Sequence, residues 1–178
     1  MIPPAKQNPR GGRPRQADMR EVLNTLLSLN RSGCQWHMLP HDLLPKSTVY
    51  DYFAQWRDDG TWTKIVQALR ERIRVAARRE PTPSAVCIAS QSVKTTETGG
   101  PARGYDGGKK IQGRKRHLLV DTLGLLIAVL ITSARLDDGM AAPLLLGLIT
   151  PAAFPRLITI FADQKYHNHT LDAWMAEH

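Results

Sequence analysis

The chain has 178 residues, and its 24 Lys and Arg against 16 Asp and Glu give a formal net charge of +8 at pH 7. Apolar residues make up 42% of the chain, close to the soluble average, so one medium domain or two small ones can form a hydrophobic core. This composition excludes a wholly disordered chain, a collagen-like fibre and a miniprotein built on disulfides. The excess of positive charge predicts a polyanionic partner.

Cysteine usage and hydropathy favour a soluble intracellular protein. Cys34 and Cys87 are far apart in the sequence and form no disulfide framework, which is typical of a reducing compartment. The longest apolar run, residues 124–131, is too short to span a bilayer, and the first residues contain no apolar signal region. We therefore expect a cytoplasmic location and no contact with a membrane.

The first 16 residues are expected to form a flexible basic arm. They combine several prolines and glycines with four basic side chains, Lys6, Arg10, Arg13 and Arg15. Such a segment has almost nothing to bury, so it is not expected to fold by itself.

Residues 17–80 are expected to form three helices. Asp18 and Glu21 resemble a capping box at the start of the first helix, and Gly33 is expected to end it. Ser47 or Thr48 can cap the second helix, which is expected to end at Asp59-Gly60. Thr61 is the expected cap of the third helix.

The third helix has a basic side, formed by Lys64, Arg70, Arg72, Arg74, Arg78 and Arg79. One interpretation is a helix-turn-helix-like DNA-binding domain in which Arg72 and Arg74 contact phosphates. The alternative is a small helical bundle whose arginines are only solvated. The sequence leaves both interpretations open.

The pattern changes after a linker at residues 81–83. Expected strands cover residues 85–88, 117–121, 125–132 and 157–161, and expected helices cover residues 141–149 and 169–177. Residues 121–124 are expected to form a hairpin turn, and residues 95–113 read as a loop. The predicted fold class is therefore α+β, with helices first and an α/β domain over residues 84–178.

Residues 94–116 are strongly basic. They carry Lys94, Arg103, Lys109, Lys110, Arg114, Lys115 and Arg116 against Glu97 and Asp106. Glycines in this segment allow a ligand to approach the backbone, and the cations could neutralise several phosphates in a salt-dependent way. A solvated loop is the alternative interpretation.

Two groups of residues suggest metal chemistry. Cys34, His37 and His41 have the spacing of zinc ligands, but no fourth Cys or His lies nearby, which argues against a structural zinc site. Asp163 follows the strand expected at residues 157–161, where open α/β sheets place ligand groups. Phosphoryl chemistry with Mg²⁺ needs further carboxylates, yet the matching position after the strand at 86–88 is Ala89.

Several motifs resemble those of bacterial insertion-sequence transposases of the DDE type, in the group related to insertion sequence five. In chain order they include Gly12-Arg-Pro-Arg15, Arg31-Ser-Gly-Cys-Gln-Trp36, Ser47-Thr-Val-Tyr50, Ser90-Gln-Ser-Val-Lys-Thr95, Gly113-Arg-Lys-Arg-His117 and Val120-Asp-Thr-Leu-Gly124. Their order and density cover nearly the whole chain. The resemblance implies a ribonuclease H-like catalytic domain after the helical domain.

The resemblance also implies a catalytic triad of two aspartates and a glutamate that holds two Mg²⁺ ions. Asp163 matches the second aspartate, whereas Ala89 stands where the first aspartate belongs. The glutamate position falls beyond His178, which suggests a C-terminally truncated copy. Asp121, Asp137 and Asp138 match no catalytic position of the family. A single carboxylate is not expected to hold the metal ions productively.

We therefore expect a transposase-related protein that binds the double-stranded DNA of element ends but cannot cut or join it by itself. The same reasoning implies association with the nucleoid, and an intact transposase or further copies of the chain as possible partners. Two alternatives stay open. The chain could be a regulator that competes with an intact transposase at the element ends, or a non-functional remnant that folds poorly because a sheet edge is unpaired.

Overall fold

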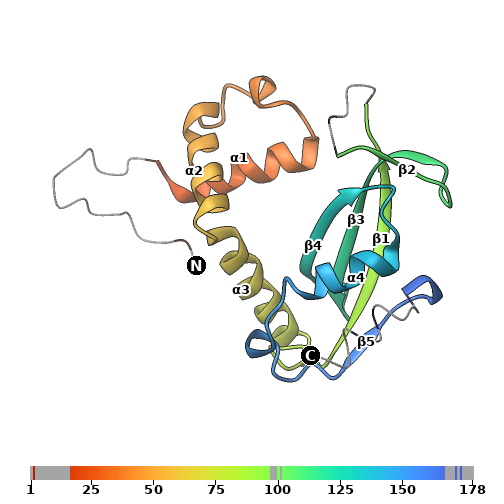
Figure 1. Cartoon of the computed structure of the whole chain (residues 1–178). Helices are drawn as coiled ribbons and strands as arrows, with labels where there is room; N and C mark the ends of the chain where they lie inside the picture. The colour runs from red at the N-terminus through yellow and green to blue at the C-terminus, as the bar shows by residue number, and fades with distance from the viewer. Residues whose placement is uncertain are drawn as a thin grey trace. The chain divides into compact units, whose positions relative to one another are not determined.

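The computed structural model describes Ile2, residues 17–96, Gly100, residues 102–166, Leu171 and Ala173. Backbone contacts divide the chain into two compact units, Met1–Ala68 and Leu69–His178 (Figure 1). The basic arm expected over residues 1–16, with Arg13 and Arg15, lies outside the described residues except for Ile2. The helix expected over residues 169–177 also lies outside them, except for Leu171 and Ala173. The expected boundary at residues 81–83 remains a prediction.

The first unit is helical, and its first helix begins and ends as expected. Helix α1 spans Met19–Ser32, and the side chain of Asp18 accepts a hydrogen bond from the backbone N–H of Arg20 at 2.8 Å. Gly33 follows with a φ of 65°, a conformation that suits glycine, and its N–H bonds the carbonyl of Leu29. Local capping chemistry therefore sets both ends of α1.

The other two helices begin differently from the prediction. A 3₁₀ turn, η1, spans Trp36–Met38, and helix α2 spans Lys46–Asp58. Pro45 precedes α2 in an extended conformation and provides no side-chain cap, so the expectation of a Ser47 or Thr48 cap is wrong. Helix α3 spans Thr61–Ala76, and the carboxylate of Asp59 accepts the N–H of Thr61 at 3.0 Å. Asp59 thus performs the capping role that the sequence suggested for Thr61.

The core of the first unit joins α1 to α2 and to the start of α3. Val22, Leu26, Val49 and Trp56 are buried together. The rings of Trp56 and Trp62 meet edge to face, with their centroids 5.3 Å apart. Such aromatic pairs add to the free energy gained from area burial, so these rings hold the three helices together.

The second unit contains a mixed five-stranded sheet with strand order β2-β3-β1-β5, and β4 also pairs with β3. The strands are β1 (Ala85–Lys94), β2 (Gly104–Asp106), β3 (Ile111–Asp121), β4 (Leu126–Ser133) and β5 (Thr159–Phe161). All pairs are antiparallel except that of β1 with β5, which is parallel. With helices before the sheet, the α+β class is confirmed.

The sheet is more extensive than the sequence predicted, and part of the expected loop is strand. β1 continues to Lys94, and β2 with the start of β3 replaces part of the expected loop over residues 95–113. Gly113 pairs with Lys94, and a Cβ on Gly113 would lie only 1.9 Å from the carbonyl oxygen of Val93. The glycine therefore allows the two backbones to approach, rather than marking a loop.

The hairpin turn expected at residues 121–124 is confirmed. The N–H of Gly124 donates to the carbonyl of Asp121 at 2.9 Å, and Gly124 has a φ of 77°. The carboxylate of Asp121 also accepts the N–H groups of Leu123 and Leu125.

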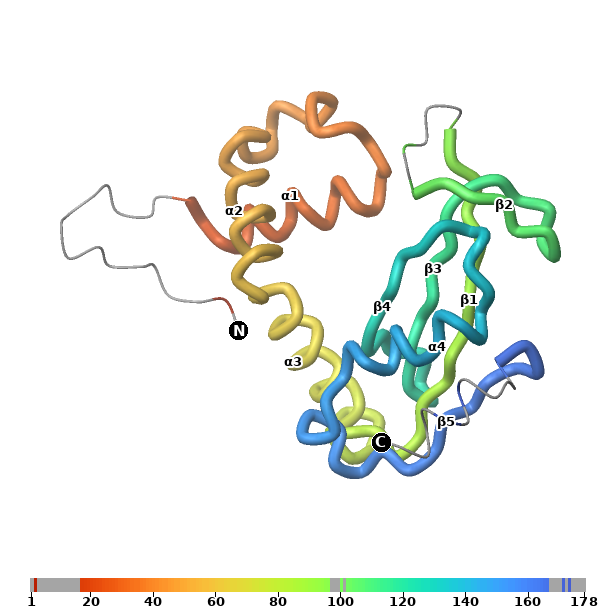
Figure 2. Tube along the Cα trace, in the orientation of Figure 1, coloured from red at the N-terminus to blue at the C-terminus, as the bar shows by residue number. Residues whose placement is uncertain are grey.

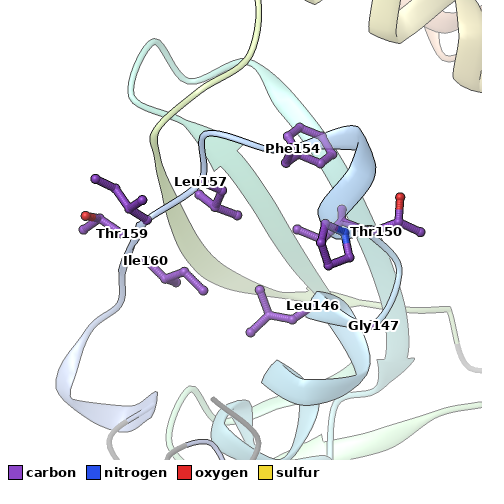
Figure 3. A pocket seen from close by; sticks show the side chains of 10 residues that line it. Leu146, Gly147, Thr150, Phe154, Leu157, Thr159 and Ile160 are labelled. Atoms are coloured by element: carbon purple, nitrogen blue, oxygen red, sulfur yellow. The ribbon is translucent and has the colours of Figure 1, made fainter. Parts of the chain in front are cut away.

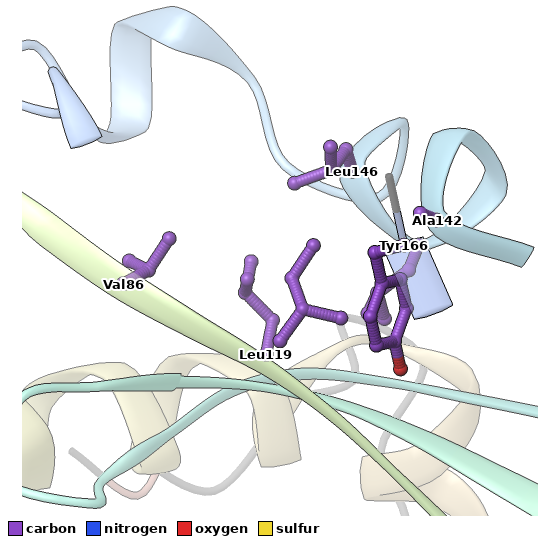
Figure 4. Close-up of a cluster of buried hydrophobic side chains, with 7 residues drawn as sticks. Val86, Leu119, Ala142, Leu146 and Tyr166 are labelled. Carbon is purple, nitrogen blue, oxygen red and sulfur yellow. The ribbon is translucent and has the colours of Figure 1, made fainter. Parts of the chain in front are cut away.

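Helix α4 spans Asp138–Leu146 and covers one face of the sheet (Figure 1). It begins three residues earlier than expected because the side chain of Asp137 accepts the N–H of Gly139 at 2.9 Å. Figure 4 shows Leu146, Ala142 and Tyr166 gathered with Leu119 of β3 and Val86 of β1. This cluster is the core of the second unit.

Adjacent leucines of α4 provide a test of this packing. Leu145 is fully buried, whereas Leu144 is 57% exposed. We expect Leu145→Ala to lower the free energy of unfolding by about 3 kcal/mol, because it removes buried methyl groups and leaves a cavity. Leu144→Ala is expected to change it by less than about 1 kcal/mol. Urea unfolding followed by circular dichroism measures both; equal losses, or no cooperative transition in the wild type, would contradict this fold.

Candidate active site and nucleic-acid interface

The two predicted catalytic positions, 89 and 163, follow strands β1 and β5, which pair in parallel. The last pair of this ladder joins Cys87 to Phe161, and the two strands run side by side in Figure 2. Ala89 and Asp163 each lie two residues further along the chain, and both are exposed. The structure therefore places them at the same end of neighbouring segments.

A short turn follows Asp163. One oxygen of its carboxylate accepts the N–H of Lys165 at 3.0 Å, and its carbonyl accepts the N–H of Tyr166 at 3.1 Å. These bonds start the 3₁₀ turn η3, Gln164–Tyr166. The ring of Tyr166 is buried against α4 and the sheet, and burial raises the pKa of its hydroxyl to about 12. Tyr166 thus anchors the segment that carries Asp163 to the core.

The remaining aspartates of interest hold the fold together. Asp121 forms a buried ion pair with Arg74, and Asp137 caps α4. Asp138 lies 3.0 Å from the ammonium of Lys115, and Asp106 lies 3.4 Å from the same group. Each of these carboxylates therefore has a structural role in the fold.

Lys115 is the centre of a buried polar network that the sequence did not reveal. Its ammonium donates to the carbonyl of Leu136 at 2.8 Å and pairs with Asp138 and Asp106. Ser92 donates a hydrogen bond to Asp106, and this bond is the first cause that lowers the pKa of that carboxyl. Burial by itself raises the pKa of Asp138, because it disfavours the charged form. Hydrogen bonds and the charge of the nearby Lys115 ammonium outweigh this effect, so the pKa of Asp138 is lowered.

Burial removes two of the predicted DNA contacts. Lys115 and Arg74 are each only 5% exposed, and both are ion-paired, so they are not available to a phosphate. The burial of Lys115 could have been predicted from alternation along β3, since residues 113, 115, 117, 119 and 121 are all buried. The burial of Arg74 could not have been predicted from periodicity along α3, because Arg74 contacts its partner Asp121 only in the folded unit.

The other predicted cations of the second unit remain at the surface. Exposed side chains are those of Arg72, Lys94, Lys109, Lys110, Arg114 and Arg116. Arg114 and Arg116 lie on the face of β3 opposite the buried residues. Lys94 ends β1 opposite Gly113, next to Arg114 in β3. The sheet therefore presents several cations around one end of β1 and β3.

A separate cavity of about 380 Å³ lies between the end of α4 and β5 (Figure 3). Its walls include Leu146, Phe154, Leu157 and Ile160, and none of its lining residues is charged. It therefore lacks groups for acid–base or phosphate chemistry. Among the residues that the structure describes, no group of three or more His, Cys, Asp and Glu could hold a metal, at Cys34, His37 and His41 or elsewhere.

Two family models match the chain. The model described as "Putative transposase of IS4/5 family (DUF4096)" matches residues 1–66, and the model "Transposase DDE domain" matches residues 80–178. The chain belongs to the DDE transposases of the IS4/5 family. No curated protein and no solved structure matches it. No described helix is long and apolar enough to cross a membrane.

Transposases with this domain generally use a divalent metal, but the residues of this DDE domain do not fit one. Mg²⁺ prefers carboxylate oxygens, and a two-metal centre needs several of them. The methyl group of Ala89 has no ligand atom. Of the described carboxylates near it, Asp163 is exposed at the end of β5, and Asp138, which lies near Ser90, is already paired with Lys115. The chemistry of the donor set therefore disagrees with a two-metal centre.

The buried network predicts a defined pH dependence of stability. The pKa of Asp106 is lower in the folded unit than its ordinary value near 4, so its contribution is present above that pH and is lost on acidification. We expect the melting temperature of Asp106→Asn to lie below that of the wild type at pH 7, and the difference to become smaller as the pH falls below 4. Circular dichroism melts measure this, with the exposed Asp51→Asn as control. A difference that stays the same as the pH falls would contradict the assignment.

Proposed function

We propose that this member of the transposase family binds double-stranded DNA and, as the 178-residue chain, does not cut it. The exposure of Arg114 and Arg116 beside the buried Lys115 supports DNA binding most directly. Phosphate contacts of this kind provide affinity without reading sequence. The family domains indicate a role in transposition, so we propose that the DNA bound is the ends of the transposable element.

The arrangement of elements supports a ribonuclease H-like domain. Strands β1, β3 and β4 are antiparallel, α4 follows them, and β5 then returns parallel to β1. For the first unit, we propose a helix-turn-helix role. Three consecutive helices and the two-residue connection Asp59-Gly60 support that role.

Loss of cutting rests on position 89. In-line phosphoryl transfer with two metals needs carboxylates that hold both ions, and Ala89 provides none beside Asp163. The described residues around this position are well packed: β1 is paired on both sides, and Tyr166 anchors η3 to the core. On this proposal the chain keeps DNA binding and lacks DNA cleavage.

A regulatory role is the second candidate. A chain that keeps its exposed cations and lacks the carboxylate at position 89 would occupy element ends without processing them. It would then compete with an intact transposase, or assemble with one. Gel-shift titration against element ends and scrambled duplexes tests this role; equal affinity for both would argue against it.

The double variant Arg114→Gln/Arg116→Gln tests the DNA surface. We expect its affinity for duplex DNA to fall about tenfold and the slope of log affinity against log salt to fall by about 2, one unit for each lost phosphate contact. Fluorescence anisotropy with a labelled duplex measures both quantities. Arg156→Gln removes an exposed cation elsewhere and is the control. An unchanged slope in the double variant would contradict this surface.

Cleavage is tested separately with supercoiled plasmid in Mg²⁺ or Mn²⁺. We expect the wild-type chain to nick no more than Asp163→Asn, because one carboxylate does not assemble the metal centre. Agarose gels resolve the nicked form. Nicking by the wild type that disappears in Asp163→Asn would overturn the proposed loss of cutting.

A further inference from the structure

Three buried polar atoms of the second unit form no hydrogen bond with any residue that the structure describes. They are Nδ1 of His117, Oδ1 of Asp138 and the hydroxyl oxygen of Tyr166. Oδ1 of Asp138 has the ammonium of Lys115 at 3.0 Å as an ion pair, but it too accepts no hydrogen bond. His117 and Tyr166 are each 1% exposed and Asp138 is 5% exposed. Because a buried polar atom without a partner is costly, each of the three is expected to have one.

The three atoms come from different elements and lie near one another. Nδ1 of His117, in β3, is 4.0 Å from Oδ1 of Asp138, in α4, which is too far for a hydrogen bond. Burial raises the pKa of the Tyr166 hydroxyl most, and the charge of Asp138 raises it further, so this hydroxyl lies near the same carboxylate. Tyr166 belongs to η3. β3, α4 and η3 therefore each bring one polar atom to the same place.

The hydrogen bonds of Thr132 decide which nitrogen of His117 carries the proton. The hydroxyl of Thr132 donates to the carbonyl of Ser133 at 3.0 Å, so its hydrogen is already used. Nε2 of His117 lies 3.0 Å from the same hydroxyl oxygen and is therefore the donor. Burial lowers the pKa of His117, so the ring is neutral at pH 7. Nδ1 of His117 is then an acceptor without a hydrogen.

Two acceptors therefore face each other, with one donor nearby. Nδ1 of His117 and Oδ1 of Asp138 both need a hydrogen, whereas the hydroxyl of Tyr166 has one to donate. A water molecule has the matching groups, because it donates two hydrogens and accepts at its oxygen. A distance of 4.0 Å between two acceptors is one that a single water bridges. Buried waters in proteins typically form about three such bonds.

We propose that this place is a binding site for one internal water molecule. The water donates to Nδ1 of His117 and to Oδ1 of Asp138, and it accepts from the hydroxyl of Tyr166. It thereby joins β3, α4 and η3, and η3 is the turn that follows Asp163. The inference is independent of DNA binding and of cutting, because it concerns the interior of the second unit.

A crystal structure of the 178-residue chain tests the water directly. We expect electron density for one ordered water within hydrogen-bond distance of all three atoms. Well-ordered side chains with no such density between them would overturn the inference. A direct hydrogen bond between Nδ1 of His117 and Asp138, at about 3 Å, would also overturn it.

NMR of the nitrogen-15-labelled chain at pH 7 tests the tautomer. The variant His117→Gln identifies the ring signals of His117 among those of the six histidines. We expect the proton on Nε2 and none on Nδ1. A proton on Nδ1 would contradict the inference, because His117 could then donate to Asp138 without a water.

Tyr166→Phe tests the third hydrogen bond, since it removes only the hydroxyl. We expect its melting temperature to lie about 3 °C below that of the wild type, because one buried hydrogen bond is lost. A melting temperature that is equal or higher would show that the hydroxyl has no partner and would count against the water. The matched control Tyr105→Phe removes a hydroxyl from a tyrosine of β2 that is 53% exposed, and is expected to shift the melting temperature by less than about 1 °C. Circular dichroism melts measure both variants.

Discussion

The parallel pairing of β5 with β1 is the contact on which the candidate site depends. Its register, with Cys87 opposite Phe161, is what brings Ala89 and Asp163 to the same level although 73 residues separate them in sequence. The core beneath α4 stabilises this pairing, because Val86 of β1 and Tyr166 of η3 belong to one buried cluster. Without it, Asp163 would be an isolated aspartate in a turn, and position 89 would have no particular partner.

A buried ammonium group, that of Lys115, connects β2 to α4. Lys115 joins Asp106 at the end of β2 to Asp138 at the start of α4, and both carboxylates remain ionised because of it and their hydrogen-bond donors. Burying such charges is costly unless each is paired, so this network specifies one arrangement of the β2–β3 turn. That turn carries Lys109 to Ser90. In β3, therefore, the side chain of Lys115 is buried and stabilises the fold, whereas its neighbours Arg114 and Arg116 are exposed to solvent.

Local signals in the sequence predicted the helical unit more closely than the sheet. Asp18 and Gly33 mark the ends of α1 because capping and a left-handed glycine act within a few residues. Strand β2 and the extension of β1 to Lys94 escaped prediction because their residues are polar or glycine, and only pairing with β3 makes them strands. Propensity describes what a segment does alone, whereas strand pairing depends on a partner that is distant in the chain.

The sequence alone determined the chemistry that is present: an alanine where a metal ligand is expected, one aspartate at position 163, and an excess of cations between residues 94 and 116. These are properties of side chains and need no fold. Only the tertiary structure decided which cations face solvent and which carboxylates are already paired. Lys115 and Arg74 resemble their exposed neighbours in sequence, but burial beside Asp138 and Asp121 gives them a structural role. The physical reason is that burying a charged side chain is costly unless a group of opposite charge pairs with it, and here that group is distant in the sequence.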